Sequence, residues 1–160
     1  MRWFRRPSEP AAVERAPGAV SDAGSDRDEL VLPGTLLELD RFVNRSSGQL
    51  PTSAVVKARW IIDTLRAVLR TAENRPLDIQ AVLTVRGTAN DYLPTTLRGY
   101  LSLAEAGRAE AADRLLDEQL DTLQEAATTT LAAARDLDAD ALATQGAFLR
   151  AKFSRSELDL

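Results

Sequence analysis

The sequence contains no cysteine and no histidine, has one methionine, and only 5% of its 160 residues are aromatic. Without cysteine the chain can form no disulfide, no thiolate metal site and no cysteine nucleophile. Without histidine it lacks the usual general base near neutral pH and the commonest metal-ligating side chain. Serine–histidine–aspartate, cysteine–histidine and histidine–zinc chemistries are therefore excluded within one chain. We expect a protein that is not an enzyme and uses no cofactor.

Charge is unevenly distributed along the chain, whose formal net charge is -4. Residues 1–27 and 28–103 each carry a net charge of +1, whereas residues 104–160 carry six bases and twelve acids. This acidic C-terminal third lacks the basic footprint of a nucleic-acid-binding protein, so we expect no nucleic-acid partner. No apolar run approaches the roughly 20 residues that span a bilayer. The basic start is not followed by the apolar segment of a signal peptide, which predicts a cytoplasmic protein.

Composition also predicts how the chain is divided. Residues 7–28 are rich in proline, glycine, serine and aspartate and contain few large apolar side chains that could offset the entropy cost of ordering. We therefore expect a disordered tail over residues 1–28 and a single helical domain over residues 29–156.

Within the domain, apolar residues recur at helical spacing and no segment has the alternating pattern of a strand. The apolar faces that we expect to be buried include Trp60, Ile79, Val82, Val85, Leu97 and Leu103. The expected helices cover about 33–44, 52–74, 78–105 and the chain from 109 onward, with Thr52 or Ser53 as the cap of the second. The sequence thus predicts an all-α fold, an antiparallel bundle of four to five helices.

Two places leave the number of helices open. Pro94 either kinks one near-continuous helix or occupies the first turn of a new helix capped by Asp91. The apolar stripe keeps its phase across Pro94, which favours the kinked helix. An unbroken last helix would be about 68 Å long, so we expect a bend or break near residues 136–140.

Two basic clusters are candidate binding sites. Trp3 and Phe4 with Arg5 and Arg6 could insert at a membrane interface or bind a partner, or form an accidental cluster in a disordered end. On the second helix, a basic stripe could bind a phosphate, an anionic lipid or an acidic partner; its members are Arg59, Arg66 and Arg70. The alternative is a solvated helix face with Arg59 paired to Asp63, four residues on.

Acidic residues raise the question of a metal site. Asp117 with Asp121, or the run from Asp136 to Asp140, could hold magnesium, which requires convergent oxygen ligands. The run lacks the glycine and terminal glutamate of a calcium loop, and no glycine-rich phosphate loop is present. Surface charge and helix capping explain these acids more simply.

The most distinctive string is DYLPTTLRGYLSL, which contains both tyrosines. Its notable residues are Asp91, Tyr92, Leu93, Pro94, Leu97 and Tyr100. The tyrosines could be contacts in a groove, or the apolar residues could be core and Pro94 could set a bend.

This string resembles a motif of small helical bacterial proteins of uncharacterised function and, more remotely, of the 5-bromo-4-chloroindolyl phosphate hydrolysis family, which is associated with toxic-anion resistance. The similarity covers roughly residues 50–155 and includes the Tyr92–Leu97 string and the C-terminal segment 140–153. It implies a helical bundle and transfers no catalytic residue.

Three functions follow as hypotheses. The first is a non-enzymatic cytoplasmic protein that acts through contacts with an unknown partner or with itself, in envelope or toxic-anion stress. The second is a peripheral membrane-associated regulator that touches anionic lipid through its basic clusters. The third is a metal-dependent phosphohydrolase that uses Asp117 and Asp121, which we rank last.

Overall fold

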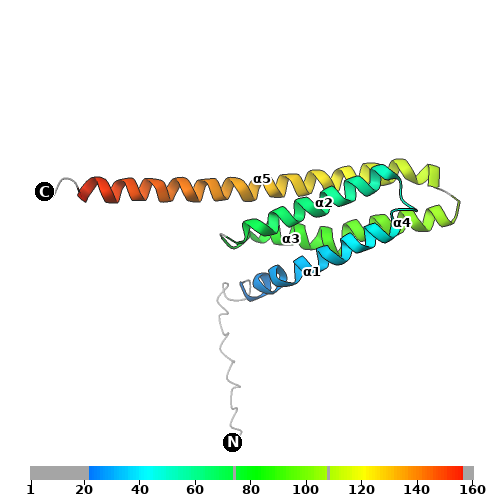
Figure 1. The fold of residues 1–160 in the computed structure, drawn as a ribbon, viewed down its shortest axis with the longest axis horizontal. Coiled ribbons are helices and arrows are strands. Elements are labelled where there is room, and N and C mark those ends of the chain that lie inside the picture. The colour runs from blue at the N-terminus through cyan, green and yellow to red at the C-terminus, as the bar shows by residue number, and fades with distance from the viewer. Residues whose placement is uncertain (1–21, 74, 108, 157–160) are drawn as a thin grey trace, which may run out of the picture.

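The computed structural model describes residues 22–73, 75–107 and 109–156, with side chains described over 31–73, 75–107 and 112–152. Every regular element in these ranges is helical (Figure 1). The elements are α1 (Asp22–Ser46), α2 (Thr52–Thr71), α3 (Ile79–Gly87), η1 (Thr88–Tyr92), α4 (Leu93–Glu105) and α5 (Ala109–Ser156). Because α3, η1 and α4 follow one another without a gap, the described chain forms four antiparallel rods. This confirms the predicted all-α bundle.

The first helix is longer than the sequence predicted. α1 begins at Asp22, so the expected start at Pro33 is wrong, and Pro33 lies inside the helix. The rest of the expected tail, residues 1–21, lies outside the described residues. A tight turn follows α1, in which the Gln49 backbone N–H donates to the Ser46 carbonyl.

The start of α2 differs from the prediction as well. Pro51 is the N-cap, and its carbonyl accepts the Val55 backbone N–H at 3.1 Å. Neither Thr52 nor Ser53 caps the helix, because both already lie within it. At α3 the predicted start is confirmed, since the Asp78 carboxylate accepts a hydrogen bond from the Gln80 backbone N–H.

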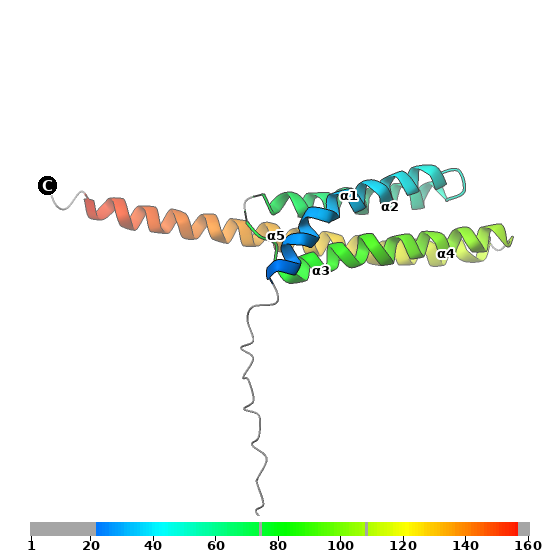
Figure 2. The same cartoon turned by 90° about the horizontal axis from the view of Figure 1, so that it is seen from below.

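The core is built from the apolar stripes of all four rods, and α2 packs against both α1 and α5. Figure 2 shows α1 and α2 on one side of the bundle and α4 and α5 on the other. The largest fully buried side chains of the core come from each rod, among them Leu36, Ile61, Ile62, Leu65, Val82, Leu93, Leu97 and Leu120. Three residues predicted on the buried stripes are instead exposed at the rim, namely Trp60, Ile79 and Leu103. The stripes therefore predicted the centre of the core correctly and its edges less well.

The helical rod formed by α3, η1 and α4 continues past Pro94 without a gap, as the unbroken phase of the apolar stripe predicted. Pro94 is buried in the first turn of α4, and the turn before it is a π-helix in which the Leu93 N–H donates to the Thr88 carbonyl. Proline has no N–H, and its ring collides with the carbonyl four residues earlier in a regular helix. The wider π turn relieves that collision while the helix continues. Leu93, Leu97 and Tyr100 accordingly stay in the core.

The predicted break near residues 136–140 does not occur. α5 is one helix of 48 residues, about 72 Å long, and it extends well past the ends of α2 and α3 (Figure 1). Extending an existing helix adds one hydrogen bond per residue without a new nucleation cost. Beyond Ala134 no described residue of α5 is buried, so this part of the helix is free to continue straight into solvent.

Truncating the core leucines tests this packing. Leu65→Ala and Leu97→Ala should each lower the free energy of unfolding by about 2–5 kcal/mol, because both side chains are fully buried and their loss leaves cavities. Chemical denaturation measures the change. Leu115→Ala is the matched control, since Leu115 is 55% exposed on α5 and its truncation should cost far less. Equal losses in all three variants would contradict the core described here.

Candidate functional site

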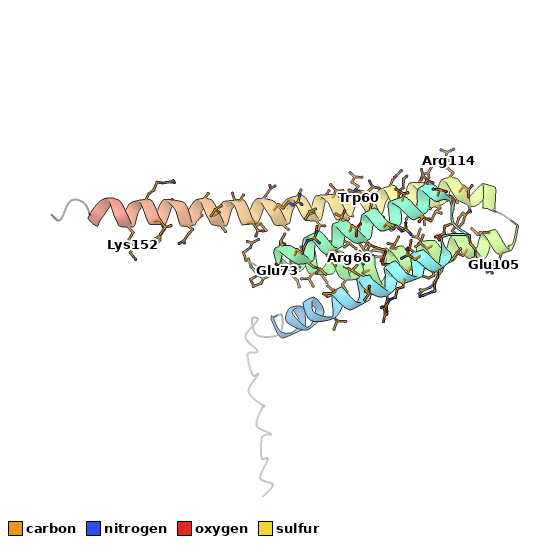
Figure 3. The ribbon with its side chains drawn as sticks, in the orientation of Figure 1. Trp60, Arg66, Glu73, Glu105, Arg114 and Lys152 are labelled. Carbon is orange, nitrogen blue, oxygen red and sulfur yellow. The ribbon has the colours of Figure 1, made fainter. Side chains whose placement is uncertain are left out.

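The basic stripe of α2 does not form an open anion site. Arg59 donates to the Asn44 side-chain oxygen on α1 at 2.5 Å, instead of pairing with Asp63 as one interpretation predicted. Arg66 pairs with Asp63 at 2.9 Å and lies 3.7 Å from Asp40. Arg70 is exposed. Two of the three guanidinium groups thus tie α2 to α1 or to its own surface. Figure 3 labels Arg66 on α2.

The second basic cluster cannot be placed. Trp3, Phe4, Arg5 and Arg6 lie outside the described residues, so their proposed role stays a prediction.

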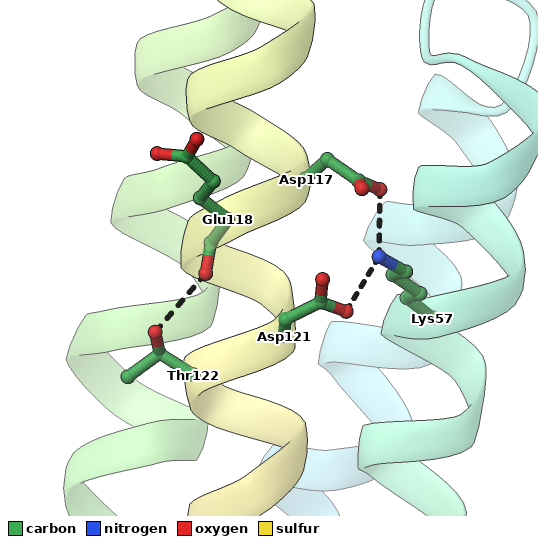
Figure 4. A network of polar contacts seen from close by, with 5 residues as sticks. All are labelled: Lys57, Asp117, Glu118, Asp121 and Thr122. Carbon is green, nitrogen blue, oxygen red and sulfur yellow. Dashed lines mark hydrogen bonds and ion pairs between the residues drawn. The ribbon is translucent and has the colours of Figure 1, made fainter.

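A single lysine joins α2 to α5 in a contact that sequence reasoning missed. The Lys57 ammonium lies 2.7 Å from the Asp117 carboxylate and 2.5 Å from the Asp121 carboxylate (Figure 4). The two aspartates are one helical turn apart on α5, so both face the same point on α2. The lysine side chain is 23% exposed, whereas the carboxylates of Asp117 and Asp121 are 49% and 59% exposed, so water still reaches the contact.

This contact changes the interpretation of the acidic pair. The carboxylates that the phosphohydrolase hypothesis assigned to a metal already face a cation, the Lys57 ammonium. Hydrogen bonds from Lys57 to Asp117 and then to Asp121 raise the pKa of the lysine above its ordinary 10.5, which keeps it charged. Within the described residues no group of three or more acidic side chains is arranged to hold a metal ion.

The DYLPTTL string has a mainly structural role. Leu93, Pro94 and Leu97 are buried, and Asp91 and Tyr92 are exposed. The Tyr92 ring lies against Gly87 so closely that a Cβ atom at residue 87 would lie 3.0 Å from the ring. The glycine therefore leaves space for the ring across the π turn.

Tyr100 ends the buried part of the string and connects α4 to α5. Its hydroxyl donates to the Asp113 carboxylate at 2.7 Å. Burial, and then the hydrogen bond to Asp113, raise the pKa of Tyr100 above its ordinary 10.0. The two tyrosines do not share a groove: one is exposed and the other is a core residue with a satisfied hydroxyl.

The end of α5 extends beyond the bundle; we call it the C-terminal arm and define it as residues 136–156. From 139 to 152 every described side chain is exposed, except that Gly146 is half-buried. The arm still carries large apolar side chains: Leu137 is 41% exposed, Leu142 74%, Phe148 58% and Leu149 41%.

These apolar residues continue the buried face of α5. Ala134 is the last buried residue, and Leu137, Ala141 and Phe148 follow it at spacings of three, four and seven, with Leu142 beside them. Such spacing keeps side chains on one face of a helix. The bend or break expected near residues 136–140 would have separated these residues from the buried face; the signal that this expectation overlooked is the helical spacing that continues through the segment.

A small cavity lies where the arm leaves the bundle. It has a volume of about 180 Å³ and is lined mainly by apolar atoms of the α2–α3 turn and of α5, including Leu77, Ala134 and Leu137. Beside it, the Arg75 Nε atom lies 3.6 Å from the Asp138 carboxylate and makes no hydrogen bond.

Fold and surface together define an all-α helical bundle with a projecting amphipathic helix. No protein-family model, no curated protein and no solved structure matches the chain. Among the described residues, no helix is long and apolar enough to cross a membrane. The resemblance carried by Tyr92–Leu97 therefore stays a prediction.

The Lys57 contact makes stability depend on pH. Lys57→Met should lower the free energy of unfolding below pH 10.5, because the charged lysine is stabilised in the folded state. This difference from wild type should shrink as pH rises through the raised pKa, where the folded lysine loses its proton. Urea unfolding across pH 8–12 in dilute solution measures it.

The only other lysine supplies the control. Lys152 is exposed on the arm, so Lys152→Met should match wild type at every pH. Tyr100 titrates in the same range, but every variant retains it and its effect cancels in the difference. A Lys57→Met deficit that stays constant to pH 12 would contradict the proposed role of the lysine.

Proposed function

We propose that this chain is a non-enzymatic protein that acts by binding another polypeptide through the C-terminal arm. The observation that carries the proposal is the continuation of the α5 core face into solvent, with Leu142, Phe148 and Leu149 exposed. A helix kept only for stability would gain nothing from apolar side chains beyond the bundle. A helix that binds a partner needs such anchors, at the helical spacing seen here.

The exposed apolar residues form two rows on the side of the arm that continues the buried face: Leu137 with Phe148, and Leu142 with Leu149. Gln145 lies between the two rows. Single exposed apolar residues are ordinary, whereas a continuous exposed stripe is typical of an interaction site. The opposite side of the arm presents small residues such as Ala139 and Ala143. The contrast between the two sides gives a partner a defined face to bind.

The cellular location and the stress role that we propose for this function rest on the sequence. Composition supports a cytoplasmic protein, and the resemblance of the Tyr92–Leu97 string supports a role in envelope or toxic-anion stress. The basic start of the chain, Arg2–Arg6, leaves room for a peripheral contact with anionic membrane.

The two other hypotheses have less support. A membrane regulator would use Arg59 and Arg66, but both are engaged with side chains of the bundle. A phosphohydrolase would need the carboxylates of Asp117 and Asp121, which already pair with Lys57. Binding of the full chain to anionic vesicles that fell on deletion of residues 1–7 would revive the membrane hypothesis.

Charge placed on the apolar face tests the proposed function. Leu142→Asp with Phe148→Asp should abolish both co-purification of a partner and concentration-dependent self-association, because each aspartate would be buried at the contact. The melting temperature should stay within a few degrees of wild type, since both residues lie outside the core. Co-purification and sedimentation measure the binding, and thermal unfolding checks the fold.

Ala143→Asp is the matched control. It adds the same charge to the same exposed segment but on the other side of the helix, so binding should survive. Loss of binding in the control as well, or no partner and no self-association in wild type, would overturn the proposed function.

A further inference from the structure

We propose that the arm binds the same arm of a second copy of this chain, with the two helices antiparallel and related by a two-fold axis near Gln145. This inference rests on the proposed function, because it names the occupant of the surface described there. It is carried by the order of charges along the arm and by what lies between them.

The charges of the arm are separated into two blocks. Asp136, Asp138 and Asp140 form an acidic block, and Arg150 and Lys152 form a basic block. The nine residues between them, 141–149, carry no charge and include Leu142, Phe148 and Leu149. The acidic block lies in the middle of α5, where the helix dipole gives no reason for acids to gather.

Antiparallel pairing makes this pattern complementary to itself. With the axis at Gln145, Asp138 of one copy lies opposite Lys152 of the other, because both stand seven residues from Gln145 and share its side of the helix. Asp136, Asp140 and Arg150 lie toward the other side of the arm. The uncharged segments then pack on each other, with Leu142 opposite Phe148. A parallel pair would instead place acids beside acids and bases beside bases, which is repulsive. A two-fold contact also closes on itself, so it gives a dimer and no filament.

The bundle sets the extent of the contact. The apolar face of the arm begins beside the α2–α3 turn, where Leu77 and Leu137 line the cavity of about 180 Å³. In the antiparallel register residue 152 of the second arm lies opposite residue 138, at that turn, and its last helical turn, 153–156, lies opposite residues 134–137. Because each arm is a solvent-exposed continuation of a longer helix, both faces are formed before they meet (Figure 1).

Other occupants fit less well. An anionic membrane would attract Arg150 and Lys152 but would repel the acidic block on the same helix. An unrelated protein would have to supply a basic and an acidic side chain at matching positions. A second copy of this chain supplies both, because the two-fold axis places Lys152 of each arm opposite Asp138 of the other.

Cross-linking tests the orientation, and the absence of cysteine makes each introduced thiol the only one in the chain. With a short-span thiol cross-linker, full-length Gln145→Cys should form a covalent dimer, because the two thiols meet at the axis. Lys152→Cys alone should not, because its copies would lie roughly 21 Å apart along the helices. A mixture of Asp138→Cys and Lys152→Cys chains should cross-link to each other. Self-linking of Lys152→Cys to the extent of Gln145→Cys would show a parallel pair and overturn the proposal.

Charge reversal tests the complementarity. Asp138→Lys should weaken dimerisation at low salt at least tenfold in sedimentation equilibrium, and Lys152→Glu should do the same. Combining both substitutions exchanges the two charges, restores complementarity and should return the dissociation constant to within a few-fold of wild type. Failure of the combined variant to dimerise, with unchanged helicity and melting temperature, would contradict the proposal.

The outcomes separate this inference from the proposed function. A wild-type chain that stays monomeric at high concentration but binds another protein through Leu142 and Phe148 would keep the proposed function and remove the self-pairing. A dimer that persists in Leu142→Asp with Phe148→Asp would show a contact elsewhere in the chain and overturn both.

Discussion

The packing of α2 against α5 is the contact on which the rest of the molecule depends. Ile62 and Leu65 on one helix and Leu120 on the other are fully buried. The Lys57 ammonium, held between Asp117 and Asp121, adds a polar contact between the same helices. α5 is more than twice as long as α2, with 48 residues against 20, so α2 can cover only part of it. The arm extends beyond the bundle as a direct consequence of this difference in length.

The π turn before Pro94 has a comparable role on the other side of the bundle. Had the proline broken the helix, Leu97 and Tyr100 would have lost their place beside α5. The turn instead absorbs the proline and keeps the stripe in phase, so that the Tyr100 hydroxyl reaches Asp113. The distinctive Tyr92–Leu97 string is therefore explained by its packing: it allows a proline to be buried within a continuous helical rod.

Sequence reasoning succeeded where a signal is local. The spacing of Val82, Val85 and Leu97 predicted core positions, and all three are fully buried. It failed where the outcome depends on what lies opposite. The charged faces of α2 and α5 predicted only solvated surface, since no local pattern indicates that Lys57 meets two aspartates 60 or more residues away. The same applies to Arg59, whose partner is on α1 instead of four residues along its own helix.

The lack of cysteine and histidine, the helical stripes and the order of charges in the arm are properties of the sequence by itself, and they determine an all-α chain without the common catalytic side chains. Tertiary structure decided which part of each stripe is covered. The stripe of α5 is uniform along the chain, and Leu120 and Leu142 follow the same helical pattern. One is buried and the other is 74% exposed, because α2, α3 and α4 end before the arm begins. Burial depends on the neighbours that the fold places beside a face, and that information is not contained in the face itself.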